Sequence, residues 1–126
     1  MARVAAVTAA VGFVLLAGFQ AALALGAPWG RAAWGGAHER LPRGLRIGSA
    51  IAVIVWLVAA LVVLARAGYD WSPVPLGVAR WGTWVLFALL AVGTLMNLAS
   101  RSRVERLIQT PVAAALSILC LLVALA

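Results

Sequence analysis

Long apolar runs alternate with short polar segments along this chain. The apolar runs cover about residues 4–25, 47–64, 81–98 and 107–126, and each is 18 to 22 residues long. At 1.5 Å per residue, an α-helix of that length reaches about 27–33 Å, close to the thickness of the hydrocarbon core of a bilayer. Each run is apolar on every side, which is typical of helices surrounded by lipid. The pattern therefore predicts four transmembrane helices.

We expect an all-α, polytopic membrane protein in which the four transmembrane helices form two antiparallel hairpins within one domain, residues 1–126. The composition supports this fold class, because 66% of the residues are apolar and only 10% are charged, with a mean hydropathy of +1.10. A soluble domain of this size would leave roughly a third of its chain surface in water. Soluble enzymes and disordered tails are therefore excluded.

The first apolar run allows a second interpretation. Residues 4–25 resemble a secretory signal peptide, with Arg3 before the run and Ala22-Leu23-Ala24 as a cleavage site. The apolar core of a signal peptide usually has about 7–15 residues, and this run is longer. We therefore favour a membrane helix.

The start of the last helix is also open to two interpretations. Ser102 and Glu105 have the spacing of a capping box, which would start the helix at Ser102 and place Pro111 inside it. A proline inside a helix removes one hydrogen bond and predicts a kink. Alternatively, the helix begins afresh with Thr110 as its N-cap and Pro111 as its first residue.

The charge is strongly positive and unevenly distributed. All ten basic residues are arginines, and the net charge is +7. Seven arginines lie in the segments 26–46 and 99–106, whereas Arg3, Arg66 and Arg80 lie at the opposite helix ends. The positive-inside rule then predicts that both segments face the cytoplasm and that both termini lie outside. A chain with arginine and no lysine also favours a bacterial plasma (inner) membrane.

Membrane lipids are the expected partners of these arginines, because the arginines flank the apolar runs and anionic head groups attract them there. Nucleic acid is not expected as a partner, since no soluble domain remains to read it. Segment 26–46 has 21 residues, which is long for a connection between antiparallel helices. Trp29 and Trp34 suit the membrane interface. The segment is either an interfacial connector or a lid over a cavity.

Polar residues inside the apolar runs are the candidates for function. Gln20, Asn97 and Gln109 lie in the leaflet that also carries the segments 26–46 and 99–106. They either bridge helices by hydrogen bonds or line a pocket for a lipid phosphate or a small anion. In the second interpretation, the pocket has a rim of arginines and an inward-facing indole as a wall: Arg46, Arg101, Arg103 and Trp56.

Catalytic chemistry has little support in the sequence. His38 is the only histidine and Cys120 the only cysteine, so no intrachain disulfide, metal site or cofactor site is expected. A cluster of His38, Glu39 and Glu105 with the arginines is conceivable as acid–base machinery, but a solvated salt-bridge network explains the same residues. We expect no catalytic residue and no enzymatic activity.

Several motifs resemble a small bacterial family of four-span integral membrane proteins of unknown function. The resemblance rests on Gly26-Ala-Pro-Trp-Gly30 with Gly35-Gly36, Leu41-Pro42 and Arg46, and on Met96-Asn97-Leu98, Ser100-Arg-Ser102 and Glu105-Arg106-Leu107 followed by Pro111. It covers nearly the whole chain. It implies four helices, a structured segment 26–46 and no established activity.

The sequence thus predicts a small membrane protein that binds lipid or an unidentified small molecule, or that assembles with itself or a partner. Small residues four apart, such as Gly18, Ala22 and Gly26, allow helices to approach closely within a bundle or a homo-oligomer. The alternative is a minimal transporter or channel formed by oligomerisation, because four helices enclose little lumen. The apolar runs lack the ring of ionisable residues that an ion pore would carry.

Overall fold

The computed structural model describes all 126 residues. The chain forms four α-helices and no strands: α1 (Ala2–Ala24), α2 (Arg43–Arg66), α3 (Leu76–Leu98) and α4 (Arg103–Leu125). Two short 3₁₀ turns, η1 (Gly30–Ala32) and η2 (Trp34–Gly36), lie between α1 and α2. All four helices are long and apolar enough to cross a membrane. The expectation of an all-α, multi-pass membrane protein is confirmed.

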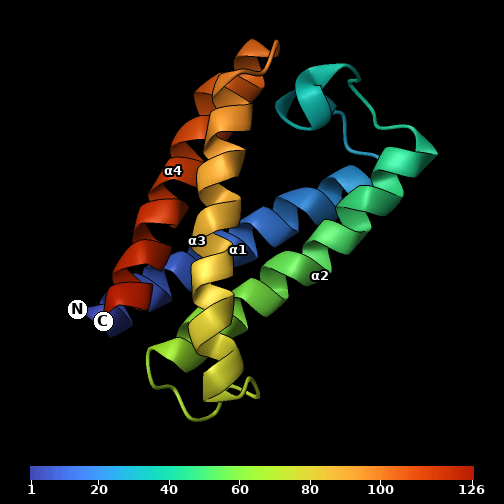
Figure 1. The fold of residues 1–126 in the computed structure, drawn as a ribbon. Coiled ribbons are helices and arrows are strands. Elements are labelled where there is room, and N and C mark those ends of the chain that lie inside the picture. Colours follow the sequence, from blue (N-terminus) through green and yellow to red (C-terminus); the bar gives the residue numbers. More distant parts are fainter.

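Consecutive helices pair into two antiparallel hairpins, α1 with α2 and α3 with α4 (Figure 1). The hairpins lie together at the end that carries both chain termini, and they diverge towards the loop that joins α1 to α2 (Figure 1). Buried apolar side chains join the two hairpins, among them Phe13, Val63, Leu86 and Leu116. The molecule is therefore a wedge with a closed end and an open end.

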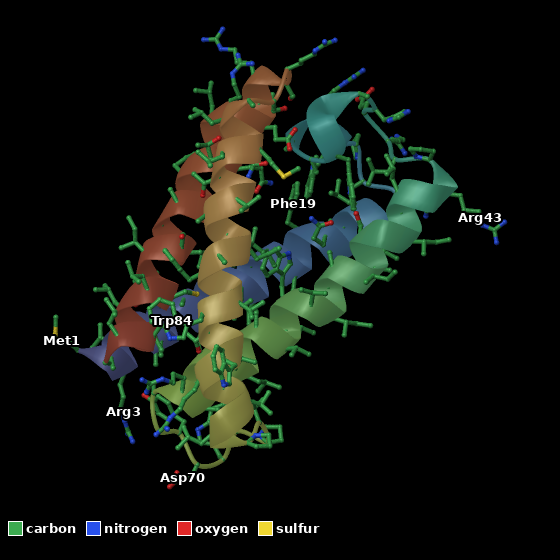
Figure 2. The ribbon with its side chains drawn as sticks, viewed as in Figure 1. Met1, Arg3, Phe19, Arg43, Asp70 and Trp84 are labelled. Carbon is green, nitrogen blue, oxygen red and sulfur yellow. The ribbon has the colours of Figure 1, made fainter.

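Two arginines fasten the closed end. Arg66 Nη2 donates to the carbonyl oxygens of Ala126 at 2.6 Å and Ala124 at 3.3 Å, where α4 leaves its last carbonyls without helical partners. Arg3 donates to Gly68 O at 3.2 Å, and its guanidinium lies 4.6 Å from the centre of the Tyr69 ring. Figure 2 shows Met1, Arg3 and Asp70 at this end and Arg43 at the open end.

The helices are longer than the apolar runs that predict them. α2 begins at Arg43, four residues before its run at 47, and α3 begins at Leu76, five residues before its run at 81. Arginine is a good helix former, and its long stem carries the charge out to the interface. Hydropathy therefore marks the part of each helix within the hydrocarbon, whereas the helix itself continues through the head-group region.

A capping interaction starts α4 at Arg103. The Ser102 hydroxyl accepts a hydrogen bond from the Glu105 backbone N–H at 3.3 Å, and Pro111 lies inside the continuous helix. The interpretation with Thr110 as N-cap is therefore wrong. The return contact of the capping box runs through Ser100, whose hydroxyl donates to Glu105 Oε2 at 2.7 Å and accepts from Ser102 N at 3.1 Å.

The loop between α1 and α2, residues 25–42, is called the first loop and forms a compact unit. Gly30 N donates to Glu39 O at 2.7 Å, which brings the two ends of the loop together. Ala33 and Leu41 pack with Leu23 of α1 in a small apolar cluster. The part of the first loop from Gly30 to Glu39, whose ends are paired, has the form of an Ω-loop.

Two side-chain hydrogen bonds and one close contact attach the first loop to the helices at the open end. The Trp34 indole N–H donates to Ser49 Oγ at 3.0 Å, and Ser49 is fully buried in α2. The Ser102 hydroxyl at the start of α4 donates to Arg31 O. Gly36 also touches Ser102, since a Cβ at position 36 would lie 2.3 Å from Ser102 Cβ. The first loop therefore bridges the gap between the two hairpins.

Candidate functional site

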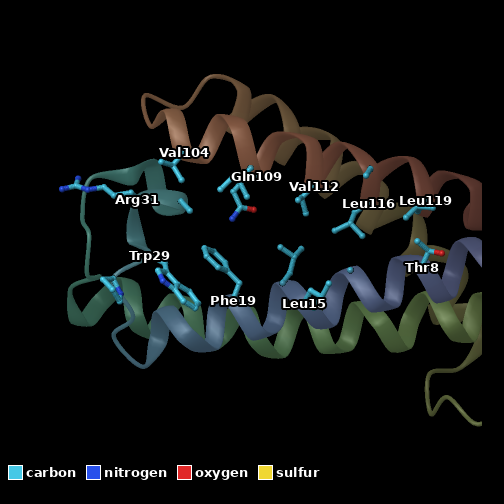
Figure 3. Close-up of a pocket in the computed structure, with 16 residues that line it drawn as sticks. Thr8, Leu15, Phe19, Trp29, Arg31, Val104, Gln109, Val112, Leu116 and Leu119 are labelled. Atoms are coloured by element: carbon cyan, nitrogen blue, oxygen red, sulfur yellow. The ribbon is translucent and has the colours of Figure 1, made fainter.

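The space between the diverging hairpins holds two neighbouring cavities. The larger one, here called the outer cleft, has a volume of about 750 Å³ and lies between α1, α4 and η1 (Figure 3). Its residues are mostly apolar: Thr8, Gly12, Leu15, Leu16, Phe19, Pro28, Trp29, Arg31, Ala32, Val104, Ile108, Gln109, Val112, Ala115, Leu116 and Leu119. Leu15 is 69% and Ile108 52% exposed, so in a membrane the cleft opens sideways to the acyl chains.

The outer cleft is apolar along its length and polar at its loop end. Phe19 stacks on Trp29 with ring centres 6.5 Å apart and planes 2° from parallel. Arg31 lies beyond this pair with its guanidinium directed outward from the cleft (Figure 3), and its Nη1 donates to Gly36 O at 2.8 Å. At the far end of the cleft, the Thr8 hydroxyl donates a hydrogen bond to Val4 O of its own helix. The cleft thus matches a molecule with a long apolar body and one polar end.

The second space, here called the central cavity, has a volume of about 430 Å³ and takes residues from all four helices. Ala32, Ala33 and Trp34 of the first loop also line it, so the loop covers the cavity. Its lining comprises Leu16, Gln20, Ala32, Ala33, Trp34, Ala52, Trp56, Leu89, Leu90, Gly93, Met96, Asn97, Glu105, Gln109, Val112 and Ala113. Four residues are shared with the outer cleft: Leu16, Ala32, Gln109 and Val112.

The central cavity brings together four of the residues that the sequence nominates. Gln20, Asn97, Gln109 and Trp56 come from four different helices and line the same space. Trp56 also packs, since its ring stacks on Phe13 with centres 5.5 Å apart and planes 10° from parallel. The expected role of Trp56 as a pocket wall therefore coexists with a packing role.

The amide side chains do not bridge the helices as the simpler interpretation expects. Gln20 Oε1 is buried and has no hydrogen-bond partner. The side-chain bonds of α3 and α4 run elsewhere, from Thr94 Oγ1 to Leu90 O at 2.7 Å and from Ser117 Oγ to Phe87 O at 3.4 Å. A buried amide oxygen without a partner is costly, so the central cavity is suited to a ligand or water that would satisfy it.

The three nominated arginines lie outside the central cavity. Arg46 Nε donates to Ala24 O at 2.8 Å and so satisfies a free carbonyl at the end of α1. Arg103 is exposed in the first turn of α4. Arg101 lines an adjoining cleft at the mouth of the central cavity, together with Trp34, Asn97 and Glu105 among others. Long arginine side chains extend to the interface. Of the three arginines expected at the rim of the pocket, Arg101 lies at the mouth, whereas Arg46 and Arg103 lie elsewhere.

Glu105 is the charged residue that the central cavity does contain. It is only 8% exposed and lines both the cavity and its mouth. The capping contacts with Ser100 and Ser102 hold it in the first turn of α4. The sequence contains the local signal for this position, because a capping box directs the Glu side chain back towards the N-cap. It contains no signal that the first loop would enclose that turn.

The acid–base cluster conceived from the sequence does not assemble. No group of three His, Cys, Asp or Glu side chains lies close enough to hold a metal ion. His38 and Glu39 are exposed in the first loop, whereas Glu105 is buried. Cys120 is buried in the core that joins the hairpins.

No family model matches this chain, and no curated protein and no solved structure matches it. The resemblance to a small four-span bacterial family therefore stays a prediction. The chain is a multi-pass membrane protein with four apolar helices, and its function is inferred from the cavities and their lining residues.

Proposed function

We propose that this protein binds a single anionic membrane lipid, with an acyl chain in the outer cleft and the head group at Arg31. The observation that carries the proposal is the shape and chemistry of the outer cleft. Its body is apolar and open to the membrane, and a cation lies at its loop end. A lipid has the same arrangement, with an apolar chain that ends in a charged head group.

The volume of the cleft favours an acyl chain over a helix of another molecule. From Thr8 to Phe19 the cleft follows α1 for about 17 Å at 1.5 Å per residue. A helix about 10 Å wide and of that length would occupy about 1300 Å³, whereas the cleft offers about 750 Å³. Small-molecule pockets usually have about 300–1,000 Å³. A second copy of the chain is therefore the less suitable occupant.

The loop end of the cleft supports an anionic head group. Arg31 uses one hydrogen bond to hold Gly36 O, and a guanidinium has five N–H donors in all. The remaining donors suit a phosphate, which accepts two parallel bonds from one arginine. Trp29 beside it is the residue type that lies at the head-group level of a membrane.

The proposal extends to the location of the protein. Seven arginines at the open end and three at the closed end support an orientation with the open end in the cytoplasm. The protein would then take its lipid from the cytoplasmic leaflet of a bacterial plasma membrane. This leaflet attracts basic segments through its anionic lipids.

Native mass spectrometry from nanodiscs of phosphatidylglycerol and phosphatidylcholine tests the proposal. Ala115→Phe places a ring in the outer cleft and should abolish the bound lipid, whereas Ala88→Phe on the exposed part of α3 should not. Arg31→Gln should remove the preference for phosphatidylglycerol, whereas Arg40→Gln, an exposed arginine of the same loop, should keep it.

Two results would overturn the lipid assignment. One is that Ala115→Phe retains as much lipid as the unaltered protein. The other is a dimer that Ala115→Phe dissociates, which would make a second copy the occupant of the cleft.

A further inference from the structure

The central cavity contains one ionisable side chain, and it is an acid. Glu105 is 8% exposed, and no arginine lines the cavity. Oε2 of Glu105 accepts a hydrogen bond from Ser100 Oγ at 2.7 Å, whereas Oε1 forms no hydrogen bond and is not fully buried. A buried carboxylate costs free energy unless a cation or several donors compensate it. This site therefore lacks a positive partner.

The groups around Glu105 complement a cation that carries N–H donors. Gln20 Oε1 is a buried acceptor without a donor, and Gln20 and Glu105 line the same cavity. Trp34 and Trp56 add two indole rings to the lining. Ring faces attract cations through their quadrupole, most strongly where water is excluded. A carboxylate, a free amide oxygen and aromatic faces together form a set of groups suited to an ammonium.

Apart from Asn97 and Gln109, the rest of the cavity is apolar. Leu16, Leu89, Leu90 and Val112 line it beside small alanines and a glycine. A volume of about 430 Å³ lies near the lower limit of ordinary small-molecule pockets, about 300 Å³. The lining and the volume thus fit a compact ligand with an apolar body, and they exclude a strongly hydrated ion.

We propose that the central cavity binds a small protonated lipophilic amine, whose ammonium lies between Glu105 and Gln20 and whose apolar part packs against Trp56 and the leucines. The site differs from the lipid site proposed above in the cavity that it uses and in the charge of its ligand, although four lining residues are shared between the two cavities. Two arginines lie near the mouth of the cavity: Arg101 is exposed, and half-buried Arg106 donates from Nη1 to Ser100 O at 2.7 Å. Neither forms an ion pair with Glu105, so the carboxylate is free to pair with a bound cation.

The experiment uses the full chain in nanodiscs and three isosteric probes. Isothermal titration calorimetry compares 4-phenylbutylamine, 4-phenylbutanol and 4-phenylbutanoate, each corrected with empty nanodiscs of the same lipid. The amine should bind and the other two should not. Glu105→Gln keeps the side-chain size and an acceptor for Ser100, and it should weaken binding of the amine about 10- to 100-fold, as expected for a charge-assisted hydrogen bond. Glu39→Gln removes the same charge from the exposed surface and should have no effect.

Further variants separate this site from the lipid site and from a folding defect. Gln20→Leu leaves Glu105 in place and should weaken binding of the amine by about tenfold. If Glu105→Gln does not fold, the Gln20→Leu variant still tests the proposal. Ala115→Phe, which alters only the outer cleft, should leave amine binding unchanged, and Glu105→Gln should leave the bound lipid unchanged. Equal binding of the amine by the unaltered protein, Glu105→Gln and Gln20→Leu would overturn the proposal, as would equal binding of the three probes.

Discussion

The attachment of the first loop to α4 predicts that two neighbouring glycines differ in their tolerance of alanine. Gly35 has a φ of 80° and Gly36 a φ of 73°, so a side chain is unfavourable at both. A Cβ at Gly35 would meet nothing within 4 Å, whereas a Cβ at Gly36 would lie 2.3 Å from Ser102 Cβ and 2.9 Å from Arg31 O. Gly35→Ala should therefore introduce backbone strain alone, and Gly36→Ala should also displace the loop from α4.

The magnitude follows from the contacts that each variant disturbs. A left-handed backbone costs an alanine about 1–2 kcal/mol at either position. Displacement from Ser102 further removes its hydrogen bond to Arg31 O and disturbs its cap on Glu105 N. Each of these is worth about 1 kcal/mol, so Gly36→Ala should open the loop more easily than Gly35→Ala by about 2 kcal/mol.

Hydrogen–deuterium exchange of the protein in nanodiscs measures this difference directly. A gap of about 2 kcal/mol corresponds to about 30-fold faster exchange in Gly36→Ala than in Gly35→Ala, at the amides of the first loop and the first turn of α4. Peptides from the closed end, which includes Arg3 and Arg66, should exchange equally in both variants. Equal rates in the first loop of both variants would refute the reasoning, because steric contact with Ser102 would then contribute nothing.

Two further predictions concern the open end of the wedge. In a Cys120→Ala background, a cysteine at the exposed position Ala37 should resist an impermeant thiol reagent added to intact cells, since we expect the first loop to be cytoplasmic; rapid labelling would reverse the orientation. Trp34→Phe removes the donor to the fully buried Ser49 hydroxyl and should destabilise the protein by about 1–3 kcal/mol. Thermal unfolding should show part of that loss recovered in the Trp34→Phe/Ser49→Ala double variant, and no recovery would mean that the hydrogen bond is unimportant.

Local properties of the sequence are sufficient to predict the four helices and the start of the last one. A run of about 20 apolar residues is stable in lipid only as a helix, because its backbone polar groups must pair within the segment. The capping box likewise needs only residues 102 to 105, and it begins α4 as one of the two interpretations expects. The apolar pattern does not predict that α2 begins at Arg43 and α3 at Leu76. Hydropathy detects the boundary of the hydrocarbon and not the first residue of the hydrogen-bonded helix.

The placement of Gln20, Asn97 and Gln109 in one leaflet also follows from the sequence, because alternate ends of successive helices lie on the same side. Whether these amides would bond to one another or face a cavity depends on the distance between helices, which the sequence does not specify. The divergence of the two hairpins decides this (Figure 1). It leaves Gln20 Oε1 without a partner and opens the central cavity.

The burial of a charge within the cavity was decided by tertiary structure, although the capping box sets the local position of Glu105. Arg46, Arg101 and Glu105 all lie within three residues of a predicted apolar run, yet Arg46 turns to the Ala24 carbonyl and Arg101 stays exposed. Glu105 is buried because Ser100 and Ser102 hold it in the first turn of α4 while the first loop closes over that turn. Burial of a short side chain depends on what packs over it, and here that partner lies about 70 residues away in the chain.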